Sequence, residues 1–200
     1  MPDYIIRPAT VDDAAQINAH RKRVSEEAYN GTTWSPGEYQ RTDNEVREAI
    51  KKALAQDNSH MLVAVADGQI IGLAVAWGGE KLAMRHMVGI GIDVHADWRN
   101  RGGGTALMRG LLDWARAHPI IHRVELEVLA NNPRALHVYE KLGFVVEGRR
   151  RDAFFKDGAF VDALVMSLMV GAGQVQQDFG EVDNKYPREP YRANARANLD

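Results

Sequence analysis

Residues 99–105 read Arg99-Asn100-Arg101-Gly102-Gly103-Gly104-Thr105, and the segments on either side decide how this stretch folds. The apolar, alternating residues 84–94 before it are typical of a strand, and apolar residues recur at helical spacing after it, as far as Ala117. A glycine turn between a strand and a helix N-terminus turns backbone N–H groups toward an anion. The two arginines add charge-assisted hydrogen bonds. The stretch therefore predicts a binding site for a phosphate-bearing ligand.

The common nucleotide-binding motifs fit this loop poorly. The phosphate-binding loop of NTPases has a lysine after its glycines, whereas Thr105 and Ala106 follow Gly104 here. The dinucleotide fingerprint G-x-G-x-x-G also fails, because the next glycine after the three consecutive ones is Gly110. For the loop taken alone, a tight turn without a ligand remains the alternative.

A second block, residues 131–144, reads NNPRALHVYEKLGF and narrows the choice of ligand for the loop. With this block the chain resembles the GNAT superfamily of acetyl-CoA-dependent N-acetyltransferases. The family's cofactor loop, R/Q-x-x-G-x-G/A, is matched by Arg99, Gly102 and Gly104. Its later motif, N-x-x-A-x-x-x-Y-x-K-x-G-F, is matched by Asn132, Ala135, Tyr139, Lys141, Gly143 and Phe144. Two motifs in the right order are more specific than either alone, and the resemblance covers roughly residues 4–169.

Composition excludes several classes of protein. The 200 residues contain 45% hydrophobic residues and no cysteine, and their formal net charge is -2. A chain without cysteine has no disulfide, no thiolate metal site and no cysteine nucleophile. The charge argues against a nucleic-acid partner, and no apolar run is long enough to span a membrane. No secretory signal is visible, so we expect a cytoplasmic protein.

The chain is expected to divide into one GNAT acetyltransferase domain, residues 1–170, and a C-terminal tail or arm, residues 171–200. Apolar residues are sparse in the second part and charges of both signs alternate, which is typical of a flexible tail. Phe179, Tyr186 and Tyr191 favour an ordered arm instead, since aromatic side chains could anchor it on this subunit or on a neighbour.

Strands and helices are predicted to alternate along the domain. The expected strands are residues 4–8, 60–66, 70–77, 84–94, 124–128, 144–148 and 160–169, and the expected helices follow Thr10, Asp43, Gly104 and Asn132. This interleaving predicts an α/β (α+β) domain in which helices cover a mixed sheet. The resemblance implies a mostly antiparallel, twisted sheet with helices on both faces and a central V-shaped splay.

The resemblance also implies where acetyl-CoA binds. Period-2 counting places Gly89 and Gly91 on one face of strand 84–94, and glycines in a strand often mark a bulge or the close approach of a ligand. In the family this strand holds the pantetheine arm, which implies backbone contacts from Ile92 and Val94. The pyrophosphate would lie on the loop and helix start, namely Arg99, Asn100, Arg101, Gly102, Gly103, Gly104 and Thr105. Asn132 would bind the pantetheine amide, cap its own helix, or do both, and Tyr139 would lie beside the acyl group.

Acyl transfer to an amine requires a neutral amine, a stabilised oxyanion and a proton for the leaving thiolate. Tyr139 is the candidate proton donor, because a phenol of pKa ~10 can donate to a sulfur whose thiol has a pKa near ~8.5. The alternative is that Tyr139 is a structural residue that packs on its helix and exposes only its hydroxyl to water. Glu127, on the polar face of strand 124–128, is the first candidate base, unless it merely pairs with an arginine. Glu26 and Glu27 could instead recognise a cationic acceptor. The histidines show no ligand spacing, so no metal is expected.

The sequence favours a small amine or an amino acid as the acceptor, because no extended acidic groove for a peptide is visible. A protein N-terminus and a non-catalytic acyl-CoA sensor are alternatives, and an ATP-dependent phosphotransferase is disfavoured by the missing lysine. Five aromatic residues suggest an aromatic-lined acceptor cleft, although a homodimer interface would use the same residues: Trp34, Tyr39, Phe154, Phe155 and Phe160.

Overall fold

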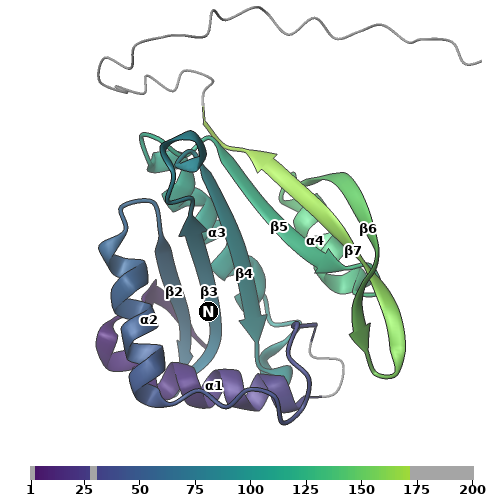
Figure 1. Ribbon diagram of the computed structural model, residues 1–200. Helices are drawn as coiled ribbons and strands as arrows, with labels where there is room; N and C mark the ends of the chain where they lie inside the picture. The colour runs from purple at the N-terminus through teal and green to yellow at the C-terminus, as the bar shows by residue number, and fades with distance from the viewer. Residues whose placement is uncertain (1–2, 28–30, 172–200) are drawn as a thin grey trace, which may run out of the picture.

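The computed structural model describes residues 3–27 and 31–171. Seven strands in these ranges form one sheet in the order β1-β2-β3-β4-β5-β7-β6 (Figure 1). The strands are Ile5–Pro8 (β1), His60–Ala66 (β2), Gln69–Gly78 (β3), Met87–Val94 (β4), Arg123–Leu129 (β5), Val145–Lys156 (β6) and Ala159–Met169 (β7). The helices are Ala14–Glu26 (α1), Asp43–Ala55 (α2), Gly103–Ala117 (α3) and Pro133–Lys141 (α4), with 3-10 turns at Val11–Asp13 (η1), Leu82–Met84 (η2) and Ala96–Trp98 (η3).

The sheet is mixed and mostly antiparallel, as predicted. Of its neighbouring strand pairs only β4 and β5 run parallel. Helices cover both faces, with α1 and α2 in front of the sheet and α3 and α4 behind it in Figure 1. Leu107 of α3 belongs to a buried cluster with Ile90 of β4, whereas Ile17 and Ile50 form a second cluster with Leu73 on the opposite face. The alternation of side chains along each strand produces these two apolar faces.

Most predicted elements are present, but the strand expected at residues 84–94 begins only at Met87. The preceding residues form η2, where Met84 N–H donates to Lys81 O at 2.7 Å. The Asn58 side chain holds this turn, because its amide donates to Gly79 O at 3.1 Å and to Arg85 O at 3.2 Å. Local alternation could not reveal a turn fixed by a residue so distant in the sequence.

The strand expected to end at Gly148 continues to Lys156. Its register against β7 shifts between Arg150 and Phe154, and Asp152 has a φ of 52°. At this irregularity the Asp162 carboxylate on β7 accepts hydrogen bonds from Asp152 N–H, at 2.8 Å, and from Arg149. A side chain thus replaces part of the backbone ladder, which is why the polar, arginine-rich sequence did not look like a strand.

The C-terminal tail or arm lies, beyond Gly171, outside the described residues. No described helix combines the length and the apolar character that crossing a membrane would need.

Asp13 fastens the end of β1 to the start of α1. Its carboxylate accepts hydrogen bonds from the Arg7 guanidinium at 2.7 and 2.8 Å, from Thr10 N–H at 2.8 Å and from Thr10 Oγ at 3.0 Å. The Arg7 hydrogen bonds are the largest reason that the pKa of this buried carboxyl falls to about 2, and the Thr10 bonds add to it. Thr10 is therefore the N-cap of η1, and Asp13 is its reciprocal partner in a capping box.

Asp13→Asn should lower the free energy of unfolding by about 2 kcal/mol at neutral pH. The Asp13 pKa is lower in the folded than in the unfolded chain, so its contribution is full above about pH 4 and is lost as pH falls through about 2. Urea titrations of both proteins at pH 7 and pH 2.5 measure this difference, which should shrink at the lower pH. Asp12→Asn is the matched control, since Asp12 is exposed. Equal effects of the two substitutions at pH 7 would contradict the assignment.

Candidate functional site

The candidate site begins where β4 and β5 part. The two strands pair only at Met87–Arg123, Val88–Val124 and Gly89–Glu125, and they diverge beyond that point (Figure 1). Each strand has a longer antiparallel partner on its other side, β3 for β4 and β7 for β5. The sheet is therefore continuous at one end and open at the other, which is the V-shaped splay that the family resemblance implies.

The open edge of β4 presents backbone groups to the gap. His95 N–H donates to Ile71 O at 3.0 Å, which identifies the odd-numbered residues as those that bond to β3. Bonding alternates along an antiparallel ladder, so the N–H and C=O groups of Ile92 and Val94 point away from β3. Val94 O accepts a hydrogen bond from Arg99 Nε at 3.0 Å. The Ile92 groups and the Val94 N–H face the gap, where β5 is too distant to pair.

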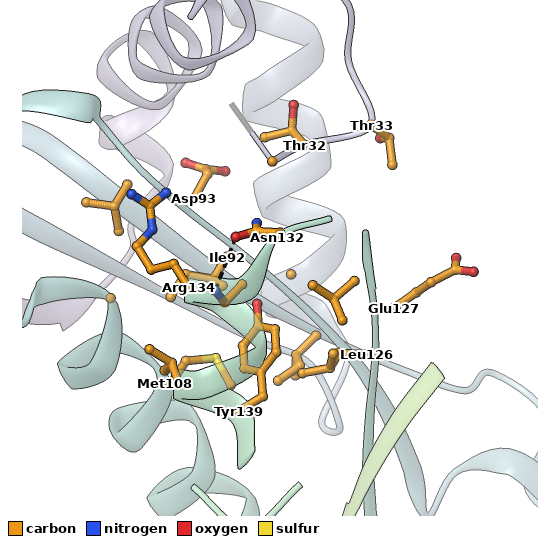
Figure 2. A pocket seen from close by; sticks show the side chains of 18 of the residues that line it. Thr32, Thr33, Ile92, Asp93, Met108, Leu126, Glu127, Asn132, Arg134 and Tyr139 are labelled. Carbon is orange, nitrogen blue, oxygen red and sulfur yellow. Dashed lines mark hydrogen bonds between the residues drawn. The ribbon is translucent and has the colours of Figure 1, made fainter. Parts of the chain in front are cut away.

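A cavity of about 710 Å³ occupies this gap and is lined from both faces of the sheet (Figure 2). The face that carries α3 and α4 contributes Ile92, Met108, Leu126 and Tyr139, together with the glycine loop. The opposite face contributes Trp77, Asp93, Glu125, Glu127 and the loop segment 32–34. Two reactants could therefore enter from opposite faces and meet in the gap.

The glycine loop forms the start of α3. Gly102 is the N-cap with a φ of 83°, a conformation that glycine adopts without steric cost. Ala106 N–H donates to Gly102 O at 2.9 Å, so the three preceding amides of the helix have no acceptor within it. Of the predicted loop residues, Arg99, Asn100, Gly102, Gly104 and Thr105 line the cavity. Arg101 and Gly103 lie outside its lining: the Arg101 guanidinium stacks over Trp98 at 4.8 Å, and Gly103 is buried.

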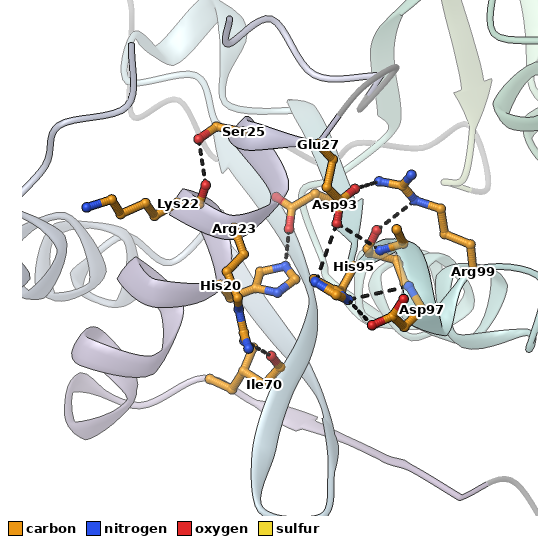
Figure 3. Close-up of polar contacts among 12 residues, drawn as sticks. His20, Lys22, Arg23, Ser25, Glu27, Ile70, Asp93, His95, Asp97 and Arg99 are labelled. Carbon is orange, nitrogen blue, oxygen red and sulfur yellow. Dashed lines mark hydrogen bonds and ion pairs between the residues drawn. The ribbon is translucent and has the colours of Figure 1, made fainter. Parts of the chain in front are cut away.

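Arg99 already has a carboxylate partner, which is Glu27 at the end of α1 (Figure 3). Glu27 also accepts a hydrogen bond from Ala96 N–H at 2.9 Å and lies 3.6 Å from His95 Nε2. Glu26 accepts from Gly37 N–H at 2.8 Å. Both glutamates hold loops in place and neither lines the cavity, which disfavours the expectation that they recognise a cationic acceptor.

Tyr139 lies on α4, and Figure 2 shows its hydroxyl pointing into the cavity on the side of Ile92. Its ring packs against Phe144, with 5.9 Å between ring centroids. Burial raises the pKa of Tyr139 to about 12. The hydroxyl is therefore a weaker acid than an ordinary tyrosine phenol, whose pKa is ~10.

Asn132 is the N-cap of α4, as the sequence suggested. Its side-chain Oδ1 accepts a hydrogen bond from Ala135 N–H at 3.2 Å, and Pro133 follows at the first position of the helix. The side chain also lines the cavity, so capping leaves its Nδ2 amide group on the cavity side.

The glutamates of β5 line the cavity with cationic partners attached. Glu127 accepts a hydrogen bond from Arg150 Nη1 at 2.5 Å, and Glu125 accepts one from Arg123 Nε at 3.1 Å. The arginine pairing weighed for Glu127 from the sequence is therefore present. Among the described residues, no group of three or more histidine, aspartate and glutamate side chains is arranged to hold a metal ion.

The expected aromatic cleft is largely wrong. Of the five predicted aromatic residues only Trp34 lines the cavity. Tyr39 is 2% exposed and packs edge-on against Trp34, whereas Phe155 and Phe160 are 65% and 68% exposed and pack on each other. Phe154 is partly buried outside the cavity.

Trp77 is the aromatic residue that sequence analysis missed. It pairs across the strands with Gly89, and its indole covers both Gly89 and Gly91. A Cβ at Gly89 would lie 2.5 Å from Trp77 Nε1. The two glycines thus make room for an indole rather than for a bare strand face. The cross-strand register, which only the structure supplies, was the missing signal.

Comparison with known proteins places the chain in a family. Residues 25–144 match the model of the acetyltransferase (GNAT) family, and the chain belongs to this family. It is 34% identical over 106 residues to an L-amino acid N-acetyltransferase of Escherichia coli K12, an alignment that covers 53% of this chain and 65% of that enzyme, just under two thirds of its length.

Solved structures share this fold. A GNAT-family acetyltransferase from Streptococcus pneumoniae superposes with a TM-score of 0.80 at 30% identity, covering 84% of this chain and 99% of that one. A phosphinothricin acetyltransferase from Sinorhizobium meliloti, solved in complex with acetyl-CoA, superposes with a TM-score of 0.76 at 21% identity, covering 88% and 93% of the two chains.

Proposed function

We propose that the protein transfers the acetyl group of acetyl-CoA to the primary amine of a small molecule by direct attack. The observation that carries the proposal is the gap between β4 and β5, into which Ile92 and Val94 direct backbone groups. An extended chain with amide groups could pair with this edge as an added strand would. The pantetheine arm of coenzyme A has that chemistry.

The cofactor would extend along the gap toward the start of α3. The unpaired amides at Gly103, Gly104 and Thr105 would bind the pyrophosphate, with the helix dipole behind them. Arg99, Asn100 and Gly102 would surround it, and the Asn132 amide would bind a pantetheine carbonyl. Since Arg99 pairs with Glu27, the backbone supplies most of the attraction for the phosphates.

In the reaction, the amine nitrogen bonds to the thioester carbon, the C–S bond breaks, and the nitrogen loses one proton while the sulfur gains one. The Ile92 N–H is available to stabilise the developing oxyanion of the tetrahedral intermediate. Glu127 is the proposed acceptor of the amine proton, directly or through water, and Arg150 holds its carboxylate in place.

Tyr139 is proposed to stabilise the leaving thiolate. With a phenol pKa of about 12, complete proton transfer to a thiol of pKa ~8.5 would be uphill by roughly 5 kcal/mol. We therefore assign the hydroxyl as a hydrogen-bond donor to the sulfur while charge develops there, with solvent completing the protonation as products leave.

The acceptor is proposed to be a small amine or an amino acid. The relative from Escherichia coli acts on L-amino acids by its name. The acceptor side carries charges of both signs, from Glu127 and Arg150, which suits an amine with a nearby carboxylate. The Lys156 ammonium on β6 donates to Thr32 O and Trp34 O, so a held loop borders this side and limits its size. A cytoplasmic location and a homodimer stay predictions.

The proposal is tested by a thiol-release screen with acetyl-CoA and pooled primary amines, including L-amino acids. Release above the rate of hydrolysis, with the acetylated amine found by mass spectrometry, is the expected result. A protein that binds acetyl-CoA and acetylates none of the pools, peptides with free N-termini included, would be a sensor rather than an enzyme.

Gly104→Val should weaken the binding of acetyl-CoA at least tenfold without unfolding the protein. A Cβ at Gly104 makes ordinary contacts with Val94 and Ile92, at 3.6 and 3.9 Å, so the fold accommodates it while the side chain enters the cavity. Calorimetry measures affinity, and the thermal midpoint reports folding. Gly148→Val is the control, since nothing lies within 4 Å of a Cβ there. Unchanged affinity in the Gly104 variant would refute the loop as the phosphate site.

Tyr139→Phe should reduce kcat by about 100-fold, because the leaving sulfur loses its hydrogen-bond donor. The affinity for acetyl-CoA should stay within about threefold, since the ring and its packing against Phe144 remain. Steady-state kinetics with an acceptor from the screen, together with calorimetry, separates the two effects. An unaltered kcat would remove Tyr139 from the chemistry.

A further inference from the structure

Asp93 is a cavity-lining carboxylate that the proposed chemistry leaves without a role. It lies on β4 between Ile92 and Val94, on the face of the sheet covered by α1 and α2. Its Oδ1 is 2.5 Å from Nε2 of His20 on α1 (Figure 3). Figure 2 shows Asp93 and Thr32 on the same side of the cavity, across from Tyr139. Its position next to Ile92 brings a carboxylate close to where the acyl carbon would be.

His20 holds this carboxylate from a fully buried position. Its side chain is 0% exposed, and its Nδ1 has no hydrogen-bond partner. A protonated ring would bury a charge and an unpaired N–H donor, so the arrangement that costs least is a neutral ring whose Nε2–H donates to Asp93. An imidazole fixed by packing restricts Asp93 to one orientation and leaves the second carboxylate oxygen unused among the described contacts.

The other cavity carboxylates are bound differently. Glu125 and Glu127 each form an ion pair with an arginine, at 3.1 and 2.5 Å, whereas among the described residues Asp93 makes no ion pair with lysine or arginine. An incoming ammonium would have to compete with a guanidinium at either glutamate. At Asp93 the ammonium would meet a carboxylate whose partner among the described residues is the His20 imidazole and not a guanidinium.

An aromatic surface lies on the same strand face as Asp93. The Trp77 indole covers Gly89 and Gly91, the two residues that precede Asp93 on this face, and Trp77 is 53% exposed. Asp93 and Trp77 both line the cavity. The face thus offers a carboxylate beside a flat apolar surface, which complements an amine with a flat apolar tail.

We propose that Asp93 binds the amine nitrogen of the acceptor, that His20 positions Asp93, and that the Trp77 indole binds the acceptor's tail. The inference rests on the proposed function, because it assumes that the acceptor enters from this face. It assigns a substrate class, which is primary amines with a flat apolar tail. In this assignment Asp93 binds the amine nitrogen, and Glu127 keeps its proposed role as the proton acceptor.

The test compares two probes of equal shape, 2-phenylethylamine and 2-phenylethanol, by calorimetry on the full chain saturated with coenzyme A. The wild-type protein should bind the amine at least tenfold more tightly than the alcohol. Asp93→Asn should bring the two affinities within about threefold, since it keeps the acceptor for His20 but removes the charge. Asp97→Asn is the control: that side chain is 81% exposed, lies outside the cavity lining, and should leave the preference unchanged.

The positioning role of His20 is tested by two substitutions. His20→Phe removes the donor at similar volume and should cut the preference for the amine at least fivefold. His20→Gln places an N–H donor near the position of Nε2 and should restore most of it. Trp77→Ala, at a position that is 53% exposed, should weaken the binding of both probes by a similar factor and leave the ratio of their affinities unaltered.

Several outcomes would overturn the inference: no preference for the amine in the wild type, a preference that survives Asp93→Asn, or one that only Glu127→Gln removes. Because the experiment measures binding, failure of this inference can be distinguished from failure of the proposed function. A protein that shows the predicted preference but releases no thiol with any amine refutes the acetyl transfer alone. A protein that acetylates amines but is insensitive to Asp93→Asn refutes this inference alone.

Discussion

The early end of the β4–β5 ladder is the constraint on which the site depends. Each strand has a longer ladder with an outer partner, so the two halves of the sheet keep their own directions once pairing stops at Gly89. The backbone groups of Ile92 and Val94 are left beside a cavity instead of a strand. Backbone donors and acceptors in partly buried places need partners, so this edge is suited to a ligand that has peptide-like groups.

The loop that completes the site is fixed by charges far apart in the sequence. Glu27 at the end of α1 binds Arg99 and the Ala96 N–H, while Arg99 reaches back to Val94 O. The face of the sheet covered by α1 and α2 is thereby joined to the glycine loop at the start of α3 on the opposite face. Because this pairing already neutralises Arg99, the attraction for a phosphate comes mainly from the N-terminal amides of α3. The proposed anion site therefore depends on backbone geometry more than on net charge.

Sequence reasoning was most successful where the structural signal is local. The strands expected at residues 60–66 and 70–77, the cap at Asn132 and the glycine turn at Gly102 follow from residue types and spacing, and all are present. It failed where distant residues decide the outcome. Trp77 covers the glycines of β4 through cross-strand register, and Asp93 meets a histidine seventy-three positions away. Neither contact can be predicted from the pattern of neighbouring residues in the sequence.

On the proposed acceptor side, the protonation state that favours binding of an amine differs from the one that reacts. Carboxylates there attract an ammonium, but attack requires the neutral amine, and an anionic setting makes the last proton harder to remove. At pH 7 the cost of neutralising an α-amine of pKa ~8 is about 1.4 kcal/mol, against about 4.6 kcal/mol for an alkyl amine near ~10.4. Glu125 and Glu127 are each paired with an arginine and Asp93 is paired with His20, so the proposed site has little capacity to offset the larger cost. We therefore expect the proposed site to acetylate amines of lower basicity, such as those of amino acids with flat apolar side chains, faster than polyamines.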